Sequence, residues 1–290
     1  MYILLPSLAY AIGLILVLWK SSTPHQEKII HLDDIGKPWR LQISLLIILV
    51  IHGLVIQNAI FKPIGLTFGF ADALSLMAWF GIVFYWLENW FLPLRGLLPM
   101  VLVMGMAFSF FPSVFPGEIL SIRAVNSQWF RWHFFVANAA YGLMSLAAIH
   151  AILMSWQDKK IRHHVSAGPQ KWYTPMLLGD AVSWLNALPP LMTMERVLFN
   201  LLRVGFVFLS LTVFSGIFFS QTLFGRSLIF DHKTVFALIA WIMFGGLLWA
   251  RWQYGLRGVQ ALRWVLSAFF MLMLAYVGSR FVIEVLLNRV

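Results

Sequence analysis

Two histidines stand at points where polar sequence gives way to long apolar runs. His133 begins a run that continues to residue 156, and His232 comes two residues before a run that starts at 234. A neutral imidazole is a good axial ligand for haem iron, while a histidine at a helix end also serves as an ordinary interfacial residue. Spacing alone leaves both interpretations open, and the first makes these two imidazoles the candidate ligands of the metal.

Aromatic and cationic residues flank the two histidines. A flat macrocycle needs apolar faces for packing and cations for its propionates, which Arg can pair bidentately. The candidates are Trp129, Trp132, Arg131 and Arg226. The tryptophans equally suit an aromatic belt at the membrane interface. The sequence contains no cysteine and therefore no C-x-x-C-H motif, so any haem would be held noncovalently.

Asp231 directly precedes His232 at the start of the second apolar run. Its carboxylate could accept a hydrogen bond from a histidine ring and fix the tautomer of that ring, as carboxylates do beside metal-bound imidazoles. The alternative is that Asp231 caps the following helix by accepting from the amides of its first turn. The two roles are compatible with each other.

Two further histidines, His52 and His150, lie inside apolar runs. His150 follows His133 by 17 residues, about 25 Å along one helix, so these two cannot hold the same cofactor. His52 could meet His150 from a neighbouring helix to form a second cofactor site, although a hydrogen bond between helices explains either residue equally well.

The composition shows which solvent surrounds the elements that carry these residues. Hydrophobic residues make up 61% of the chain and charged residues only 11%, against about 25% in an average globular protein. The chain is therefore predicted to be a membrane protein, in contact with the lipid bilayer. Eight apolar segments approach the roughly 20 residues needed to cross a bilayer, near 3–19, 41–61, 71–92, 96–114, 133–156, 201–223, 234–250 and 262–287. The predicted fold is all-α, a polytopic transmembrane helical bundle in one domain.

The distribution of Lys and Arg predicts the orientation of this bundle. With the amino terminus outside, thirteen of the 21 basic residues fall in cytoplasmic connections and six in outer ones, so the positive-inside rule places both termini outside. His133 and His232 then share the outer face. The basic charge is dispersed over separate loops, which argues against nucleic acid as a partner. The mixed segment 157–200 is expected to lie along the cytoplasmic interface or to form a plain linker.

An enzyme and a transporter are the two functional classes other than haem binding. An enzyme is not predicted, because the sequence lacks H-E-x-x-H, G-x-S-x-G and P-loop motifs. A small-solute or ion transporter without haem is the alternative function, and it would depend on charges such as Arg280, Glu284 or Glu88. Transporters commonly have two matching halves, and no such repeat is visible in the sequence.

Two stretches of sequence resemble a known family. The stretches are "WHFFVANAAYGLMSLAAIHAILMSWQDKKIR", from 132 to 162, and "IFDHKTVFALIAWIMFGGLLWARWQYGLRGVQALRW", from 229 to 264. They are similar to the CcsA/CcmC/HemX-like cytochrome c assembly proteins, and within them to the shorter, YpjD-type members. In that family an outer histidine is followed by a basic cytoplasmic turn, and an acidic residue and a lysine precede a later apolar helix.

The resemblance implies haem handling in cytochrome c biogenesis at the outer face of the bacterial cytoplasmic membrane, with other maturation components as partners. The outer histidine of the family corresponds to His133, and its acidic residue and lysine correspond to Asp231 and Lys233. His232 stands where many members have another residue. The tryptophan-rich haem-presenting motif of the family is missing here, so the resemblance implies haem binding, or a chaperone or regulatory role, more than haem presentation.

Overall fold

The structure, a computed structural model, describes residues 2–22, 38–62, 65–92, 94–120, 128–166, 188–224, 232–278 and 281–282. The predicted helical architecture is confirmed in these residues, which form eight α-helices. They are α1 (Leu5–Ser22), α2 (Pro38–Ile60), α3 (Phe70–Phe91), α4 (Leu98–Val114), α6 (Gln128–Ser166), α8 (Leu191–Phe224), α9 (His232–Tyr254) and α10 (Gly258–Met273). A π-helical turn, η5 (Leu274–Gly278), continues α10.

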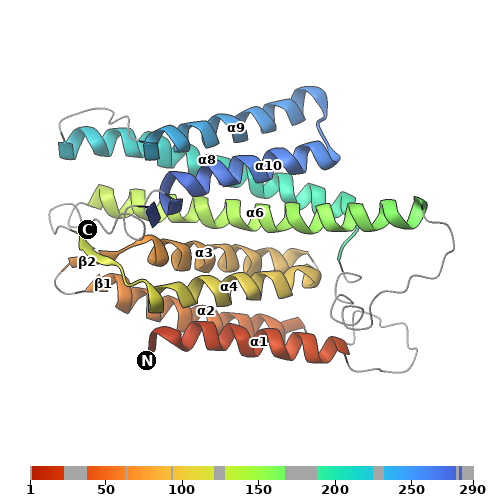
Figure 1. Cartoon of the computed structure of the whole chain (residues 1–290), viewed down its shortest axis with the longest axis horizontal. Coiled ribbons are helices and arrows are strands. Elements are labelled where there is room, and N and C mark those ends of the chain that lie inside the picture. Colours follow the sequence, from red (N-terminus) through yellow and green to blue (C-terminus); the bar gives the residue numbers. More distant parts are fainter. Residues whose placement is uncertain are drawn as a thin grey trace.

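The helices have the lengths and composition of a membrane protein. Five of the described helices, namely α2, α3, α6, α8 and α9, are long and apolar enough to cross a bilayer, and α1, α4 and α10 are shorter apolar helices. Successive helices run in alternating directions, so that α1 begins and α10 ends at the same end of the bundle (Figure 1). The number of spans and the orientation in the membrane stay predictions.

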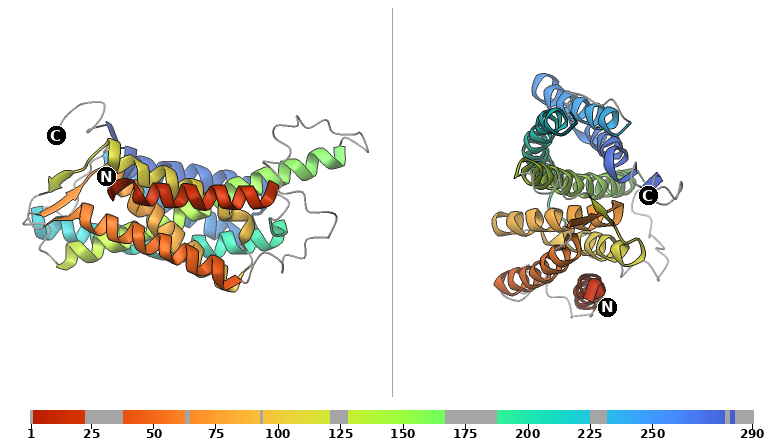
Figure 2. Two further views of the ribbon diagram at one scale, coloured as in Figure 1. Left: turned by 90° about the horizontal axis from the view of Figure 1, so that it is seen from below. Right: turned by 90° about the vertical axis from the view of Figure 1, so that its left-hand side faces the viewer.

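Helix α6 lies at the centre of the bundle and joins its two halves. It packs against α3 on one side, with α4, α2 and α1 beyond, and against α8 and α10 on the other, with α9 outermost (Figures 1 and 2). The α3–α6 contact depends on glycine, because a Cβ on Gly142 would lie 2.5 Å from the Cβ of Phe80 and 2.8 Å from the backbone N of Gly81. The backbones of α3 and α6 therefore touch directly.

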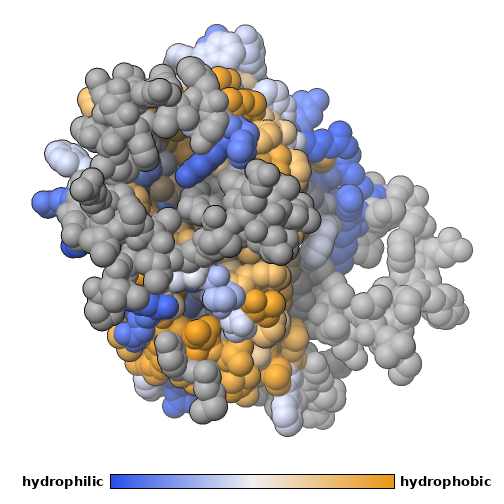
Figure 3. Space-filling model, turned by 60° about the vertical axis from the view of Figure 1, so that its left-hand side comes forward, coloured by the Kyte–Doolittle hydropathy of each residue, from blue (hydrophilic) through white to orange (hydrophobic). Residues whose placement is uncertain are grey.

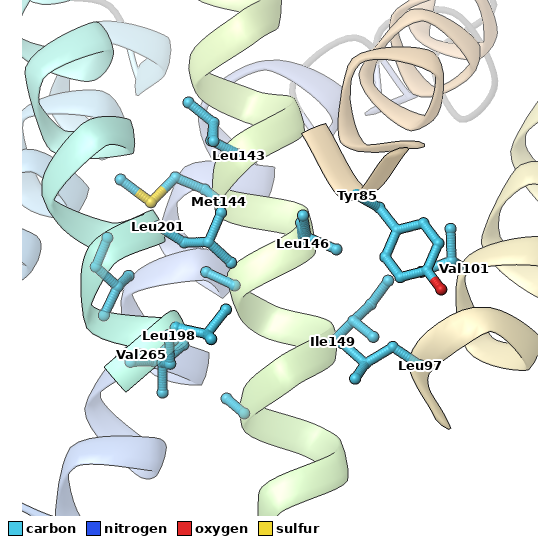
Figure 4. Packing of buried hydrophobic residues seen from close by; sticks show 14 of the residues in the cluster. Tyr85, Leu97, Val101, Leu143, Met144, Leu146, Ile149, Leu198, Leu201 and Val265 are labelled. Carbon is cyan, nitrogen blue, oxygen red and sulfur yellow. The ribbon is translucent and has the colours of Figure 1, made fainter. Parts of the chain in front are cut away.

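The core around α6 is apolar on both of its sides. Leu143 and Met144 point toward α8, where Leu198 and Leu201 lie, and Ile149 points toward Tyr85 and residues of α4 (Figure 4). The outer faces of the bundle, in contrast, expose large apolar side chains, as a lipid-facing surface does. Examples are Leu8, Ile12 and Leu16 in α1 and Ile242 and Trp252 in α9.

Helix α6 is longer than its apolar run predicted. It has 39 residues, about 58 Å, beginning five residues before His133 and ending at Ser166 (Figure 2). Its last turns remain helical beyond the apolar run, and an ion pair between Asp158 and Arg162 one turn apart supports them. The predicted interfacial segment 157–200 therefore begins and ends as helix, in α6 and α8, and residues 167–187 lie outside the described residues.

A small antiparallel sheet, which was not predicted, closes one end of the bundle. Strands β1 (Phe61–Lys62), β2 (Gly65–Phe68) and β3 (Glu118–Leu120) pair in the order β1-β2-β3. The pairing ties the α2–α3 connection to the segment after α4. Strands of two to four residues are too short to show an alternating pattern in sequence. We call this end, where α6 and α9 begin and α8 ends, the sheet end.

Candidate functional site

The sheet end brings together the helix termini that carry both candidate haem ligands. His133 lies in the second turn of α6 and His232 is the first residue of α9, and both helices begin at this end beside the end of α8 (Figure 1). Figure 3 turns this end forward and shows hydrophilic residues scattered over it, with hydrophobic residues along the flanks. The structure thus agrees with the expectation that the two histidines lie on the same side of the bundle.

The ring of His133 is held by a hydrogen-bonded serine on α8. Its Nδ1 lies 2.8 Å from the Oγ of Ser215, and that hydroxyl donates to the backbone carbonyl of Thr212 at 3.2 Å. A serine hydroxyl has one hydrogen, so Ser215 accepts from His133 when it donates to Thr212. With Ser215 donating to Thr212, the proton of His133 lies on Nδ1 and the lone pair on Nε2, which is the arrangement of a metal-binding imidazole.

The position of the His133 ring is also set by its packing. A Cβ on Gly216 would lie 3.4 Å from the Cε1 atom of His133, so the ring edge that carries Nδ1 and Cε1 faces the α8 backbone. Lys233 in the first turn of α9 acts electrostatically on the same ring. Because Lys233 adjoins His232 in the chain, the start of α9 belongs to the neighbourhood of His133.

Exposed aromatic residues lie close to His133 along α6 and close to Ser215 along α8. Trp129 is 79% exposed and Trp132 is 59% exposed, as are large parts of Phe135 on α6 and Phe218 on α8. Arg131 is also exposed. These side chains offer apolar faces and a cation at the sheet end, and the same exposure is what an aromatic belt in the interface would show.

The remaining predicted residues are only partly described. His232 is exposed. Asp231 and Arg226 lie outside the described residues, as do Arg280 and Glu284 of the transporter alternative. Their predicted roles therefore stay predictions.

His52 and His150 are both fully buried, and among the described residues no hydrogen bond joins their rings. His52 uses both ring nitrogens, with Nδ1 3.0 Å from the Tyr10 hydroxyl and Nε2 3.0 Å from the Ser75 hydroxyl, so ligation of a metal would require breaking one of these bonds. His150 donates from Nδ1 to the carbonyl of Leu146 on its own helix, at 3.0 Å. The described contacts of His52 support the alternative given for it above, a hydrogen bond between helices.

Sequence reasoning missed Ser215, the residue that fixes the His133 ring. A serine inside an apolar helix usually bonds back to its own helix, so it gives no signal of a partner on another helix. The one available hint is the small Ser215-Gly216 pair, because small residues in membrane helices often mark close contacts between helices.

Comparisons with known proteins show to which family the chain belongs. The profile of a family described as "Cytochrome C assembly protein" matches residues 41–287, which include most of α2, all of α3 to α10 and both candidate ligands. The chain belongs to this family. Helix α1 lies before the matched range.

Individual members of the family and related proteins match at lower coverage. The chain is 29% identical over 150 residues to inner membrane protein YpjD of Escherichia coli, which covers 52% of this chain and 50% of that protein. It is 30% identical over 194 residues to a 28.8 kDa protein of Azospirillum brasilense, covering 66% and 65%. It is 28% identical over 198 residues to cytochrome c biogenesis protein CcsA of Heterosigma akashiwo, covering 62% and 61%. The match thus spans about half the length of YpjD.

Proposed function

We propose that this protein binds haem noncovalently at the sheet end of its bundle, with Nε2 of His133 as an axial ligand, in a step of cytochrome c biogenesis. Membership of the cytochrome c assembly family supports the process, and the name of the CcsA relative points to the same process. The YpjD relative supports the inner membrane of a bacterium as the location. The distribution of Lys and Arg supports an orientation with the sheet end outside. The proposed role is haem binding in a chaperone or regulatory capacity, without catalysis.

The observation that carries the proposal is the chain from His133 to Ser215 to Thr212. An imidazole binds iron through an unprotonated nitrogen, and partners that hold the other nitrogen raise its basicity and fix its orientation. Ser215 meets this requirement at 2.8 Å, and its own donation to Thr212 sets the direction of the bond.

The other residues of the sheet end fit the remaining parts of haem. Trp129 and Trp132 expose apolar ring faces, and Arg131 offers a guanidinium for a propionate. His232, as first residue of α9, supplies a second imidazole, and Lys233 adds positive charge beside His133. Bound haem would supply the iron that His133 ligates. The residues of this chain would orient the haem and balance the negative charge of its propionates.

The proposal is tested by adding haem to the detergent-purified protein and recording its absorption spectrum. Wild type is expected to show a Soret band shifted from that of unbound haem, and His133→Ala is expected to lose it or weaken binding severely. His232→Ala is expected to change the spectrum to that of haem with a weaker sixth ligand.

The matched control is His150→Ala, which removes a fully buried histidine from the same helix. It is expected to leave the Soret titration unchanged. If His133→Ala binds haem as wild type does, the proposed ligand is wrong. If the wild-type protein does not bind haem, the proposed cofactor is wrong.

A further inference from the structure

A second polar site lies in the other half of the bundle, among α1, α2, α3 and α4. Its centre is a hydrogen-bonded chain in which His52 of α2 lies between the hydroxyl of Tyr10 on α1 and the hydroxyl of Ser75 on α3, at 3.0 Å from each. Tyr10 and His52 are 0% exposed and Ser75 is 5% exposed. Three helices thus contribute one residue each to a polar chain inside an apolar bundle.

The packing around this chain is specific. The ring of Tyr10 meets that of His52 edge-on at 5.5 Å. A Cβ on Gly105 of α4 would lie 2.9 Å from a carbon of the Tyr10 ring, so the bare backbone of α4 provides the space that Tyr10 occupies. All four helices of this half are therefore needed to build the site.

A cavity of about 10 Å³ adjoins the chain, close to the space that one water molecule needs. Most of its wall is apolar, formed by residues such as Pro6, Ile56 and Ala59. Its polar lining consists of His52, Ser75, Asp72 and Ser109. A buried water commonly makes about three hydrogen bonds, and this lining offers enough partners.

Asp72 connects the cavity to the sheet end. It stands in the first turn of α3, where its Oδ2 accepts a hydrogen bond from the backbone N–H of Gly69 at 3.0 Å. Ser75 follows one turn deeper, and His52 lies about 12 Å along α2 from the end of that helix. The polar lining thus runs from the end of the bundle into its interior.

We infer that the cavity holds an internal water that joins Asp72 to the chain of Ser75, His52 and Tyr10, and that the four groups form a proton path from the sheet end to His52. A proton passes from solvent to the Asp72 carboxylate and on to the cavity water. The water then protonates the Ser75 hydroxyl as that hydroxyl transfers its own hydrogen to Nε2 of His52. The ring, which donates from Nδ1 to Tyr10, becomes an imidazolium with both N–H groups bonded to hydroxyl oxygens.

The path ends at His52 and does not cross the bundle. Among the described residues, the titratable groups that contact His52 or line the cavity with it are Tyr10 from α1 and Asp72 from α3, while α4 contributes only the neutral Ser109. Lys62 in β1, after the end of α2, is exposed. The site therefore exchanges protons with one face of the membrane, and it is separate from the proposed haem site on α6, α8 and α9.

The test is hydrogen–deuterium exchange at Cε1 of each histidine ring. Exchange is carried out on the full chain in detergent without haem, and the rate of each histidine is then read from its peptide by mass spectrometry. This exchange requires both contact with water and protonation of the ring. His150 is the internal control, because it is also 0% exposed but does not line this cavity. We expect His52 to exchange at least about tenfold faster than His150. Equal rates for the two rings would overturn the proposal.

Two variants test the contribution of the cavity water and that of the Asp72 carboxylate separately. Ala59→Val narrows the cavity and is expected to slow exchange at His52 toward the rate of His150. Asp72→Asn keeps an acceptor for Gly69 and nearly the same volume but removes the acid, so it is also expected to slow exchange. The control Asp158→Asn, at the far end of α6, is expected to have no effect. An unchanged rate at His52 in Asp72→Asn would refute the path, and neither result depends on whether haem binds.

Discussion

Replacement of Ser215 by alanine tests whether a hydrogen bond prepares His133 for iron. The bond between Nδ1 and Oγ is 2.8 Å long and partly buried, so its loss should cost about 1 kcal/mol in orientation of the ring. Partners of metal-bound histidines typically contribute about 10- to 100-fold in affinity. We therefore expect Ser215→Ala to weaken haem binding about tenfold, less than His133→Ala does, with the fold retained.

The assay is a haem titration followed at the Soret band, with Ser210→Ala as the matched control. Ser210 lies on the same helix but accepts from the Trp241 indole N–H at 2.8 Å, so its loss should lower the stability of the α8–α9 contact and leave haem affinity unchanged. The reasoning fails if Ser215→Ala and Ser210→Ala have the same affinity while His133→Ala binds weakly. In that case the serine would hold the two helices together without preparing the ligand.

Two further predictions concern stability, measured as the thermal midpoint of unfolding in detergent. Gly142→Ala is expected to destabilise the protein by about 1–3 kcal/mol, because the added Cβ would collide with α3. The control is Gly246→Ala, whose added Cβ has its nearest contact at 4.0 Å, and it is expected to be neutral or slightly stabilising. Arg251→Ala should lower the stability by about 1–3 kcal/mol, because Arg251 pairs with Glu195 at 14–21% side-chain exposure and stacks on the ring of Phe199. The control is Arg162→Ala, which should leave the midpoint unchanged because that side chain is 71% exposed. Equal effects within either pair would contradict the packing described.

The helices were predictable because a bilayer imposes a length and an apolar composition on each segment that crosses it. The start of α9 at His232 follows from the change in polarity that the sequence shows at that point. The extensions of α6 beyond residues 133 and 156 and the start of α8 at Leu191 did not follow, because polar helix beyond an apolar run has no such signature. The small sheet was also missed, because its strands of two to four residues are too short to show an alternating pattern.

The two candidate ligands could be named from the sequence, whereas the hydrogen-bond partner of His133 could not. His133 stands out in sequence because an ionisable residue at the edge of an apolar run is costly and needs a reason. Its contact with Ser215 joins residues 82 positions apart, and it exists only because α6 and α8 pack together. The same holds for His52, whose partners on α1 and α3 are set by the packing of three helices and whose proposed pairing with His150 looked equally possible from sequence.

Helix α6 carries His133 near one end and a cluster of basic residues, including Lys159 and Lys160, near the other. A single unbroken helix of 39 residues is stiff along its axis. A tilt or rotation of α6 at the His133 end therefore also moves its other end. The sheet end and the opposite end of the bundle are therefore coupled mechanically through one helix.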